Sequence, residues 1–183
     1  MKKNALVFGL LSGLIITAFM VYSTLNCYFN ADFKANEIVG YAGMLVAFAF
    51  IFVGIKNYRD KYNGGVISFG RAFKTGLFIT LIASTLYVLV WVIEYYLFVP
   101  DWMDKYCTHM ITEAKASGAS QLELNKTNQQ MNWYREMYKN PLFVVLLTYV
   151  EVLPIGVVVS LISALLLKRK RPKQGGLAAA IAS

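Results

Sequence analysis

The chain has 183 residues, of which 57% are hydrophobic and only 15% are charged. Soluble domains usually carry about 25% charged residues, so this composition excludes an ordinary soluble domain and indicates a membrane protein. The formal net charge is +8, but the basic residues flank apolar segments, so we expect the lipid bilayer as a partner and no nucleic acid.

Residues 5–26 predict the first transmembrane helix, with Lys2 and Lys3 on its cytoplasmic side. A basic start followed by an apolar segment is also typical of a cleaved signal peptide. The residues before Cys27 do not fit a lipoprotein cleavage box, and no good cleavage site follows. We therefore expect an uncleaved span. Gly9 and Gly13 form a GxxxG spacing, which indicates either a close helix contact or chance.

Residues 38–55 carry no charge and predict a second span that is just long enough to cross a bilayer. The polar loop at 27–37 precedes them, and we expect it on the outer side. The following loop, 56–76, holds five basic residues against one acid, which places it on the cytoplasmic side. Asn63-Gly64-Gly65 predicts a turn in this loop. The alternating apolar residues after the turn predict a segment at the headgroup level.

Residues 75–99 predict the third span, which ends in an aromatic belt typical of a membrane interface. Residues 101–139 are the only long hydrophilic segment, and their apolar positions recur at helical spacing. Ser120 and Glu123 fit a capping box, which begins a helix. We expect two helices, roughly 101–117 and 120–139, forming an extracytoplasmic hairpin.

Residues 142–167 predict the fourth span, which follows Pro141 and ends on a basic cluster. The even number of spans and the distribution of basic residues place both termini in the cytoplasm. The predicted fold class is an all-α polytopic membrane protein with four transmembrane helices and an extracytoplasmic helical hairpin. We expect one domain, residues 1–173, and a flexible tail, residues 174–183.

Glu151 is the single charge in the fourth span, about nine residues from its outer end. An ionised carboxylate there costs at least ~2.5 kcal/mol, so we expect Glu151 to be protonated, paired or facing a polar cavity. Pro154 leaves the carbonyl of Val150 without its helical N–H, an arrangement that suits ion coordination. The alternative is a structural hydrogen bond from Glu151 to a neighbouring helix. We favour this alternative because the spans hold no second deep acid or base.

Glu94 shares a helix face with Tyr87 and Trp91 and lies closer to the end of its span. Glu94 is a second candidate functional carboxylate within the membrane. We favour an interfacial group that is satisfied at the membrane surface or by a base of the hairpin.

Cys27 and Cys107 both fall on the outer side, where an oxidising compartment permits a disulfide between them. Two cysteines are not a disulfide framework, so free thiols are the favoured interpretation. His109 is the only histidine, and with Cys107 alone it does not make a metal site. We expect no metal and no cofactor. The sequence shows no nucleophile elbow, HExxH or P-loop pattern, so we expect no enzyme.

Five segments resemble a known family closely when they are taken together, namely FAFIFVGIKNYRDK (48–61), GVISFGRAF (65–73), DWMDKY (101–106), ASGAS (116–120) and EVLPIGVVVSLISALLLKRKR (151–171). The family is domain-of-unknown-function family 4199, small inner-membrane proteins of Gram-negative bacteria. The resemblance covers nearly the whole chain and implies four membrane spans. It implies no activity, substrate or site residues.

The expected function is that of a non-enzymatic accessory or scaffold subunit in the bacterial inner membrane, which binds a membrane-protein partner or a second copy of itself. The alternative is a small oligomeric ion- or solute-transport protein that uses Glu151 beside Pro154.

Overall fold

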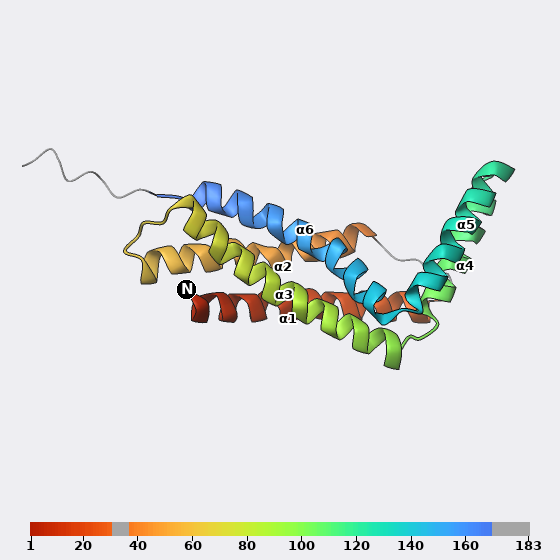
Figure 1. Cartoon of the computed structure of the whole chain (residues 1–183), viewed down its shortest axis with the longest axis horizontal. Helices are drawn as coiled ribbons and strands as arrows, with labels where there is room; N and C mark the ends of the chain where they lie inside the picture. The colour runs from red at the N-terminus through yellow and green to blue at the C-terminus, as the bar shows by residue number, and fades with distance from the viewer. Residues whose placement is uncertain (31–36, 170–183) are drawn as a thin grey trace, which may run out of the picture.

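The computed structural model describes residues 1–30 and 37–169. Four helices in this part are long and apolar enough to cross a membrane. Figure 1 shows them as one elongated bundle, from whose end a helical hairpin projects. The predicted all-α architecture with four spans is confirmed. The elements are α1 (Lys2–Phe29), α2 (Glu37–Asn57), the π-helical turn η1 (Tyr58–Tyr62), α3 (Phe69–Leu97), α4 (Trp102–Ala116), α5 (Gln121–Tyr138) and α6 (Pro141–Leu167).

The two ends of the bundle differ in chemistry. One end, here called the hairpin end, carries α4 and α5 (Figure 1). At the opposite end, here called the basic end, α1 begins and α6 finishes. Exposed basic side chains gather on the segments of this end, namely Lys2, Lys3, Lys56, Lys61, Arg71, Lys74, Lys168 and Arg169.

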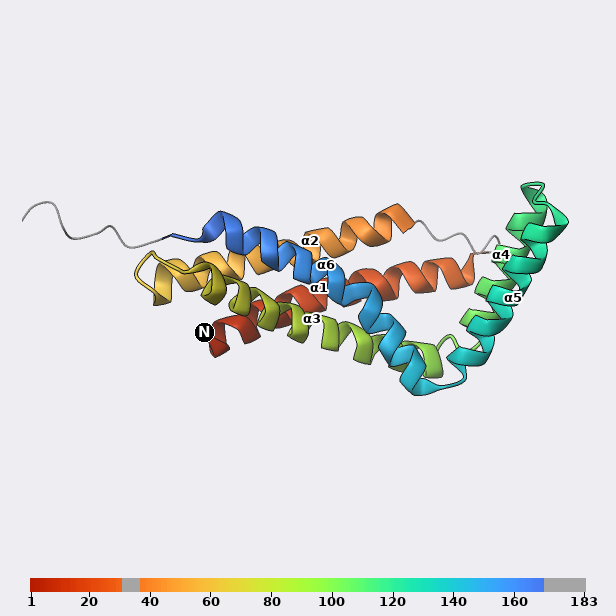
Figure 2. The ribbon, with the colours of Figure 1, turned by 45° about the horizontal axis from the view of Figure 1, so that its top comes forward.

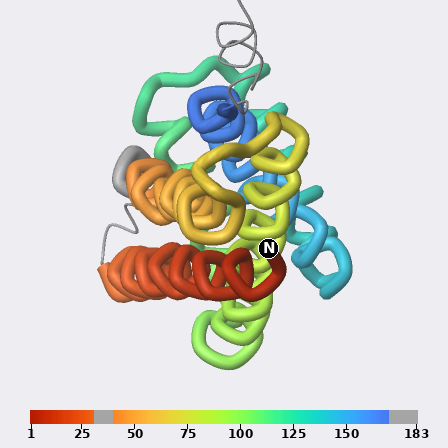
Figure 3. Tube along the Cα trace, turned by 90° about the vertical axis from the view of Figure 1, so that its left-hand side faces the viewer, coloured from red at the N-terminus to blue at the C-terminus, as the bar shows by residue number. Residues whose placement is uncertain are grey.

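The four long helices form a ring in the order α1, α2, α6, α3. Each helix packs on its two neighbours in this ring, and α2 also contacts α3 across the bundle. Figure 3, which looks along the bundle, shows the same order. Toward the hairpin end α6 stays beside α3, whereas the ends of α2 and α6 lie apart (Figures 1 and 2).

Several helix boundaries differ from the sequence prediction. α3 begins at Phe69 rather than at residue 75, so the predicted headgroup-level segment is largely the first turns of this helix. The rings of Phe69 and Phe73 stack there with centroids 5.9 Å apart, as residues four positions apart on a helix can. The predicted turn is confirmed, since Gly64 and Gly65 have φ angles of 63° and 75°, which favour glycine.

The contact between α3 and α6 depends on small side chains. The Thr80 hydroxyl donates a hydrogen bond to the Gly156 carbonyl over 3.2 Å and lies 3.0 Å from the Ser160 hydroxyl. A Cβ atom at Gly76 would stand only 2.8 Å from the Ser160 side chain, and one at Gly156 would overlap Thr80. The two backbones therefore approach as closely as small residues allow, which is how helices pack strongly in lipid.

α1 is tied to the bundle by glycines and by buried polar side chains. A Cβ atom at Gly9 would lie 2.7 Å from the Cβ of Ile82, so the predicted GxxxG contact exists and faces α3. Asn4 donates a hydrogen bond to the Gly54 carbonyl, and Ser12 donates one to the Ala47 carbonyl, both over 2.8 Å. These bonds satisfy polar groups that would otherwise be costly inside a bundle.

The hairpin forms as predicted and is attached to the end of α1. The capping box of Ser120 and Glu123 begins α5. The Tyr28 hydroxyl donates a 2.5 Å hydrogen bond to Asp101, and Lys105 lies 3.4 Å from the same carboxylate. The hydrogen bond from Tyr28 holds the pKa of Asp101 below its ordinary value. The predicted tail, residues 174–183, and the loop residues 31–36 lie outside the described residues.

We expect Gly156→Ala to lower the free energy of unfolding by about 1–3 kcal/mol, because the added methyl group overpacks the α3–α6 contact. Gly70→Ala is the matched control, since nothing lies within 4 Å of its Cβ position. In the control, alanine should be neutral or stabilise α3 by up to ~1 kcal/mol. Thermal unfolding in detergent, followed by circular dichroism, measures the difference. Equal midpoints for the two variants would contradict the close contact.

Candidate functional site

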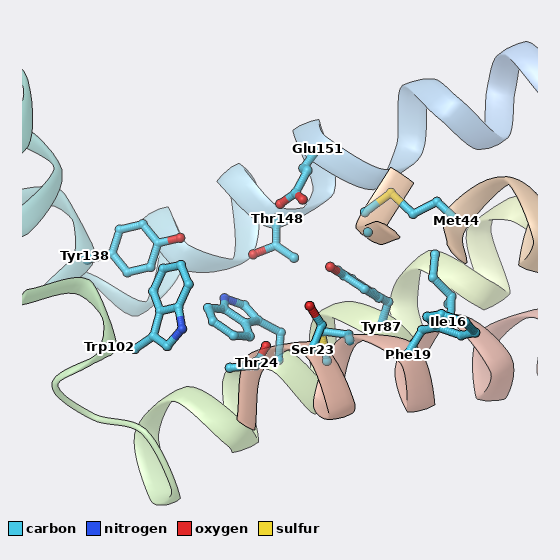
Figure 4. A pocket seen from close by; sticks show the side chains of 13 residues that line it. Ile16, Phe19, Ser23, Thr24, Met44, Tyr87, Trp102, Tyr138, Thr148 and Glu151 are labelled. Carbon is cyan, nitrogen blue, oxygen red and sulfur yellow. The ribbon is translucent and has the colours of Figure 1, made fainter. Parts of the chain in front are cut away.

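A cavity of about 210 Å³ lies inside the bundle toward the hairpin end. Every one of the six α-helices contributes to its wall. Figure 4 shows the lining side chains pointing toward a common space between α1, α3 and α6. The lining residues are Ile16, Phe19, Met20, Ser23 and Thr24 of α1, Gly40 and Met44 of α2, Tyr87 and Trp91 of α3, Trp102 of α4, Tyr138 of α5, and Thr148 and Glu151 of α6.

Aromatic side chains form the wall nearest the hairpin. Tyr87 and Trp91 are four residues apart, so they share one face of α3. Trp102 begins α4 and packs edge-on against Trp91, with ring centroids 5.4 Å apart. Tyr138 ends α5 and packs edge-on against Tyr95 at 5.5 Å. Burial raises the pKa of Tyr138, so its phenol stays neutral. The base of the hairpin thus closes the cavity.

α6 supplies the polar side of the cavity. Thr148 and Glu151 are three residues apart and face the same way. The Thr148 hydroxyl donates a 2.7 Å hydrogen bond to the Val144 carbonyl, which leaves its oxygen lone pairs available to the cavity. In Figure 4 the Glu151 carboxylate points into this space, on the side of Thr148 and Tyr87. Glu151 is exposed, so the cavity is open at this point.

Glu151 makes no hydrogen bond or ion pair to any other described residue. The structural hydrogen bond that the sequence favoured for it is therefore not found in the described part of the chain. Of the sequence alternatives, the one that agrees with the structure is a carboxylate facing a cavity. Pro154 lies outside the cavity wall, and α6 continues through it.

Glu94 corrects a second expectation. The sequence favoured a satisfied interfacial carboxylate, but Glu94 is only 4% exposed, and both of its oxygens lack a hydrogen-bond partner among the described residues. The interpretation was wrong because the last turns of α3 pack inside the bundle and bury the face that Glu94 shares with Trp91 and Tyr95. Glu94 lies one helical turn beyond Trp91, which lines the cavity, so Glu94 adjoins the cavity without lining it.

The two cysteines are buried free thiols, so the structure contains no disulfide between them. Cys107 faces the hairpin interior, with its sulfur 3.6 Å from the Met103 sulfur and 3.5 Å from the Met131 carbonyl. Burial raises the pKa of the Cys107 thiol. Across the described residues, no three or more of His, Cys, Asp and Glu gather into a group that would hold a metal ion.

Sequence reasoning singled out Glu151 but missed the aromatic residues around it. Tyr87 was noticed only as a neighbour of Glu94 on the helix. Trp102 and Tyr138 stand at the two roots of the hairpin, next to the ends of spans, and this position is the signal that places them at the mouth of the bundle.

The fold and the cavity define a four-span membrane protein with an aromatic-lined cavity that holds one carboxylate. The chain belongs to the family described as "Protein of unknown function (DUF4199)", whose model matches residues 3–169. The resemblance seen in the sequence is thereby confirmed. A comparison with curated proteins and one with solved structures each found no match.

We expect Glu94→Leu to raise the free energy of unfolding by about 1–3 kcal/mol, because it removes a buried polar group that has no hydrogen-bond partner among the described residues. Glu113→Leu, an exposed carboxylate on α4, is the matched control and should change stability by less than about 0.5 kcal/mol. Thermal unfolding of both variants in detergent measures the effect. Destabilisation by Glu94→Leu would show that Glu94 has a stabilising partner. It would contradict the finding that both carboxylate oxygens lack a hydrogen-bond partner among the described residues.

Proposed function

We propose that the protein carries a small solute across the bacterial inner membrane and that Glu151 is the group that exchanges a proton or a cation. The observation that supports this proposal is the position of the Glu151 carboxylate in a cavity, without a partner among the described residues. Because an ionised carboxylate inside a bilayer is energetically unfavourable, a carboxylate in a transmembrane helix is by default taken as a functional group. This observation reverses the preference for a scaffold that the sequence alone favoured.

The two halves of α6 have different roles in this proposal. Before Pro154, the helix contributes Thr148 and Glu151 to the cavity. After Pro154, it is held against α3 through Gly156 and Ser160. Proline removes one helical hydrogen bond and is the usual site of a helix bend. Pro154 is therefore suited to act as the joint at which the cavity half of α6 moves while the other half stays fixed.

The bundle between the cavity and the basic end is filled by large side chains. Phe48, Ile51, Ile55 and Ile79 are all fully buried there. A carrier must open this layer in a second state, and the motion of α6 at Pro154 supplies the means. Four spans are few for a carrier, so we propose that it works as an oligomer of this chain.

The orientation that we propose places both termini in the cytoplasm and the hairpin outside. Exposed lysines and arginines gather at the basic end, and such residues concentrate on the cytoplasmic side of bacterial membrane proteins.

We expect Glu151→Gln to abolish solute-driven proton movement while the protein stays folded. Proteoliposomes loaded with a pH-sensitive dye are given a pH gradient, and Na⁺, K⁺ or alkylammonium chloride is added outside. The wild type should dissipate the gradient at least tenfold faster than Glu151→Gln. Glu113→Gln, an exposed carboxylate of the hairpin, should behave as the wild type. Absence of flux in the wild type, or equal flux in the Glu151 variant, would refute the transport function.

The second candidate function is a non-enzymatic accessory or scaffold subunit, and the projecting hairpin favours it (Figure 2). Leu122 and Trp133 of α5 are 65% and 51% exposed, which gives the hairpin apolar side chains for contact with a partner.

On this second candidate, the detergent-solubilised protein should retain a stoichiometric protein partner or a second copy, and Leu122→Ser with Trp133→Ala should release it. Affinity purification followed by mass measurement of the complex tests this. Recovery of the chain alone would argue against the scaffold.

A further inference from the structure

The charge of the cavity selects the class of ligand. Among the described residues that line it, Glu151 is the only one with a formal charge. Glu94 adds a second carboxylate one helical turn beyond the lining residue Trp91 on α3. Three basic groups of the hairpin are engaged elsewhere, since Lys105 pairs with Asp101, Arg135 with Asp104 and Lys139 with Glu136. The cavity therefore favours a cation and disfavours an anion.

The presence of only one anionic ligand among the described lining residues argues against a divalent metal ion. Calcium takes six to eight oxygen ligands, and magnesium needs a near-ideal octahedron. The cavity offers one anionic ligand, the Glu151 carboxylate. The hydroxyls that also line it are neutral and belong to Ser23, Thr24, Tyr87, Tyr138 and Thr148. Most of the remaining wall is aromatic or aliphatic, so a strongly hydrated ion would lose its water shell without receiving a replacement.

The aromatic wall suits an organic cation. Four aromatic side chains of α3, α4 and α5 line the cavity, namely Tyr87, Trp91, Trp102 and Tyr138. The face of an aromatic ring carries negative potential, and cages of such rings recognise quaternary ammonium groups. Trp91 and Trp102 pack edge to face, at 87°, and Tyr106 stacks on one face of Trp102, so Trp102 has one face left for a ligand.

The size of the cavity sets the size of the ligand. A volume of about 210 Å³ lies below the ~300–1,000 Å³ that is usual for drug-sized ligands. It leaves room for a headgroup-sized cation with a few alkyl carbons. A cation of this kind would place its charge beside Glu151 and its alkyl groups against the aromatic rings and Met44.

We propose that this cavity binds a small quaternary or alkylated ammonium ion, held by the Glu151 carboxylate and by the faces of Trp91 and Trp102. This inference rests on the same cavity as the proposed transport function, and it names the class of solute.

The chain offers a direct optical probe of this site. It contains three tryptophans, of which Trp91 and Trp102 line the cavity and Trp133 is exposed on α5. In a Trp133→Phe background, all tryptophan fluorescence comes from the cavity wall. Choline is titrated into this protein in detergent micelles, and its uncharged dimethylbutanol analogue, which has the same shape, is titrated in parallel.

We expect choline to change the fluorescence saturably and the uncharged analogue to bind at least tenfold more weakly. In the same background, Glu151→Gln should weaken choline binding at least tenfold, Glu151→Asp should weaken it less, and Glu113→Gln should leave it unchanged. Incorporation of fluorinated tryptophan should lower the affinity stepwise with fluorine number, because fluorine withdraws charge from the ring face. Circular dichroism and gel filtration confirm that each variant is folded.

Equal binding of choline and the uncharged analogue would overturn the proposal, because the cavity would then be merely apolar. Absence of any choline response, or insensitivity of binding to both Glu151 substitutions, would overturn it as well. The titration involves no transport, so it separates the two proposals. Choline binding without flux would support the ammonium site and refute the transport function. Glu151-dependent flux without choline binding would support the transport function and refute ammonium ions as its ligand class.

Discussion

The close contact of α3 and α6 is the constraint on which the rest of the structure depends. Gly76, Thr80, Gly156 and Ser160 let the two backbones approach until polar side chains bond across the contact. Because α6 is held against α3 there, it stays beside α3 along its length and leaves α2 toward the hairpin end (Figure 2). The cavity lies toward this end of the bundle, where α2 contributes Met44 and α6 contributes Glu151 to its wall.

This arrangement explains how the bundle holds a carboxylate that it does not satisfy. A membrane bundle usually pairs an acidic side chain or turns it toward water. Here Gly156 and Ser160 hold α6 against α3 between one and three turns after Glu151. The Glu151 carboxylate faces the cavity. The Glu151 carboxylate therefore faces a cavity instead of forming a hydrogen bond to another described residue, which leaves it available to a ligand.

The sequence predicted the parts of the fold that depend on local patterns. Length and hydropathy located all four spans, and the capping box located the start of α5, because each signal is contained within a few turns of one helix. The start of α3 was missed because Phe69 and Phe73 alternate with polar residues, and alternation is also typical of an interfacial segment.

The cavity itself could not be predicted, because it depends on the order in which the helices pack. Trp102 and Tyr138 are far apart in the sequence, and only the closed hairpin brings both to the mouth of the bundle. Glu94 was misplaced for the same reason. Its burial depends on the last turns of α3 packing inside the bundle, and the hydropathy pattern that locates a span does not show which of its faces is buried. Whether Glu151 is paired or faces a cavity also depends on how the helices pack. The sequence spacing within α6 could therefore not decide between these alternatives.

The hairpin belongs to the site as much as the spans do. Trp102 and Tyr138 close the cavity from its base, and Tyr28 joins that base to α1 through Asp101. A movement of α4 and α5 therefore changes the wall of the cavity. Conversely, a movement of Glu151 changes the surroundings of Trp102 and Tyr138 at the base of the hairpin. A partner bound to the hairpin would act on the cavity through these aromatic side chains. The hairpin and the cavity are therefore mechanically connected in this structure.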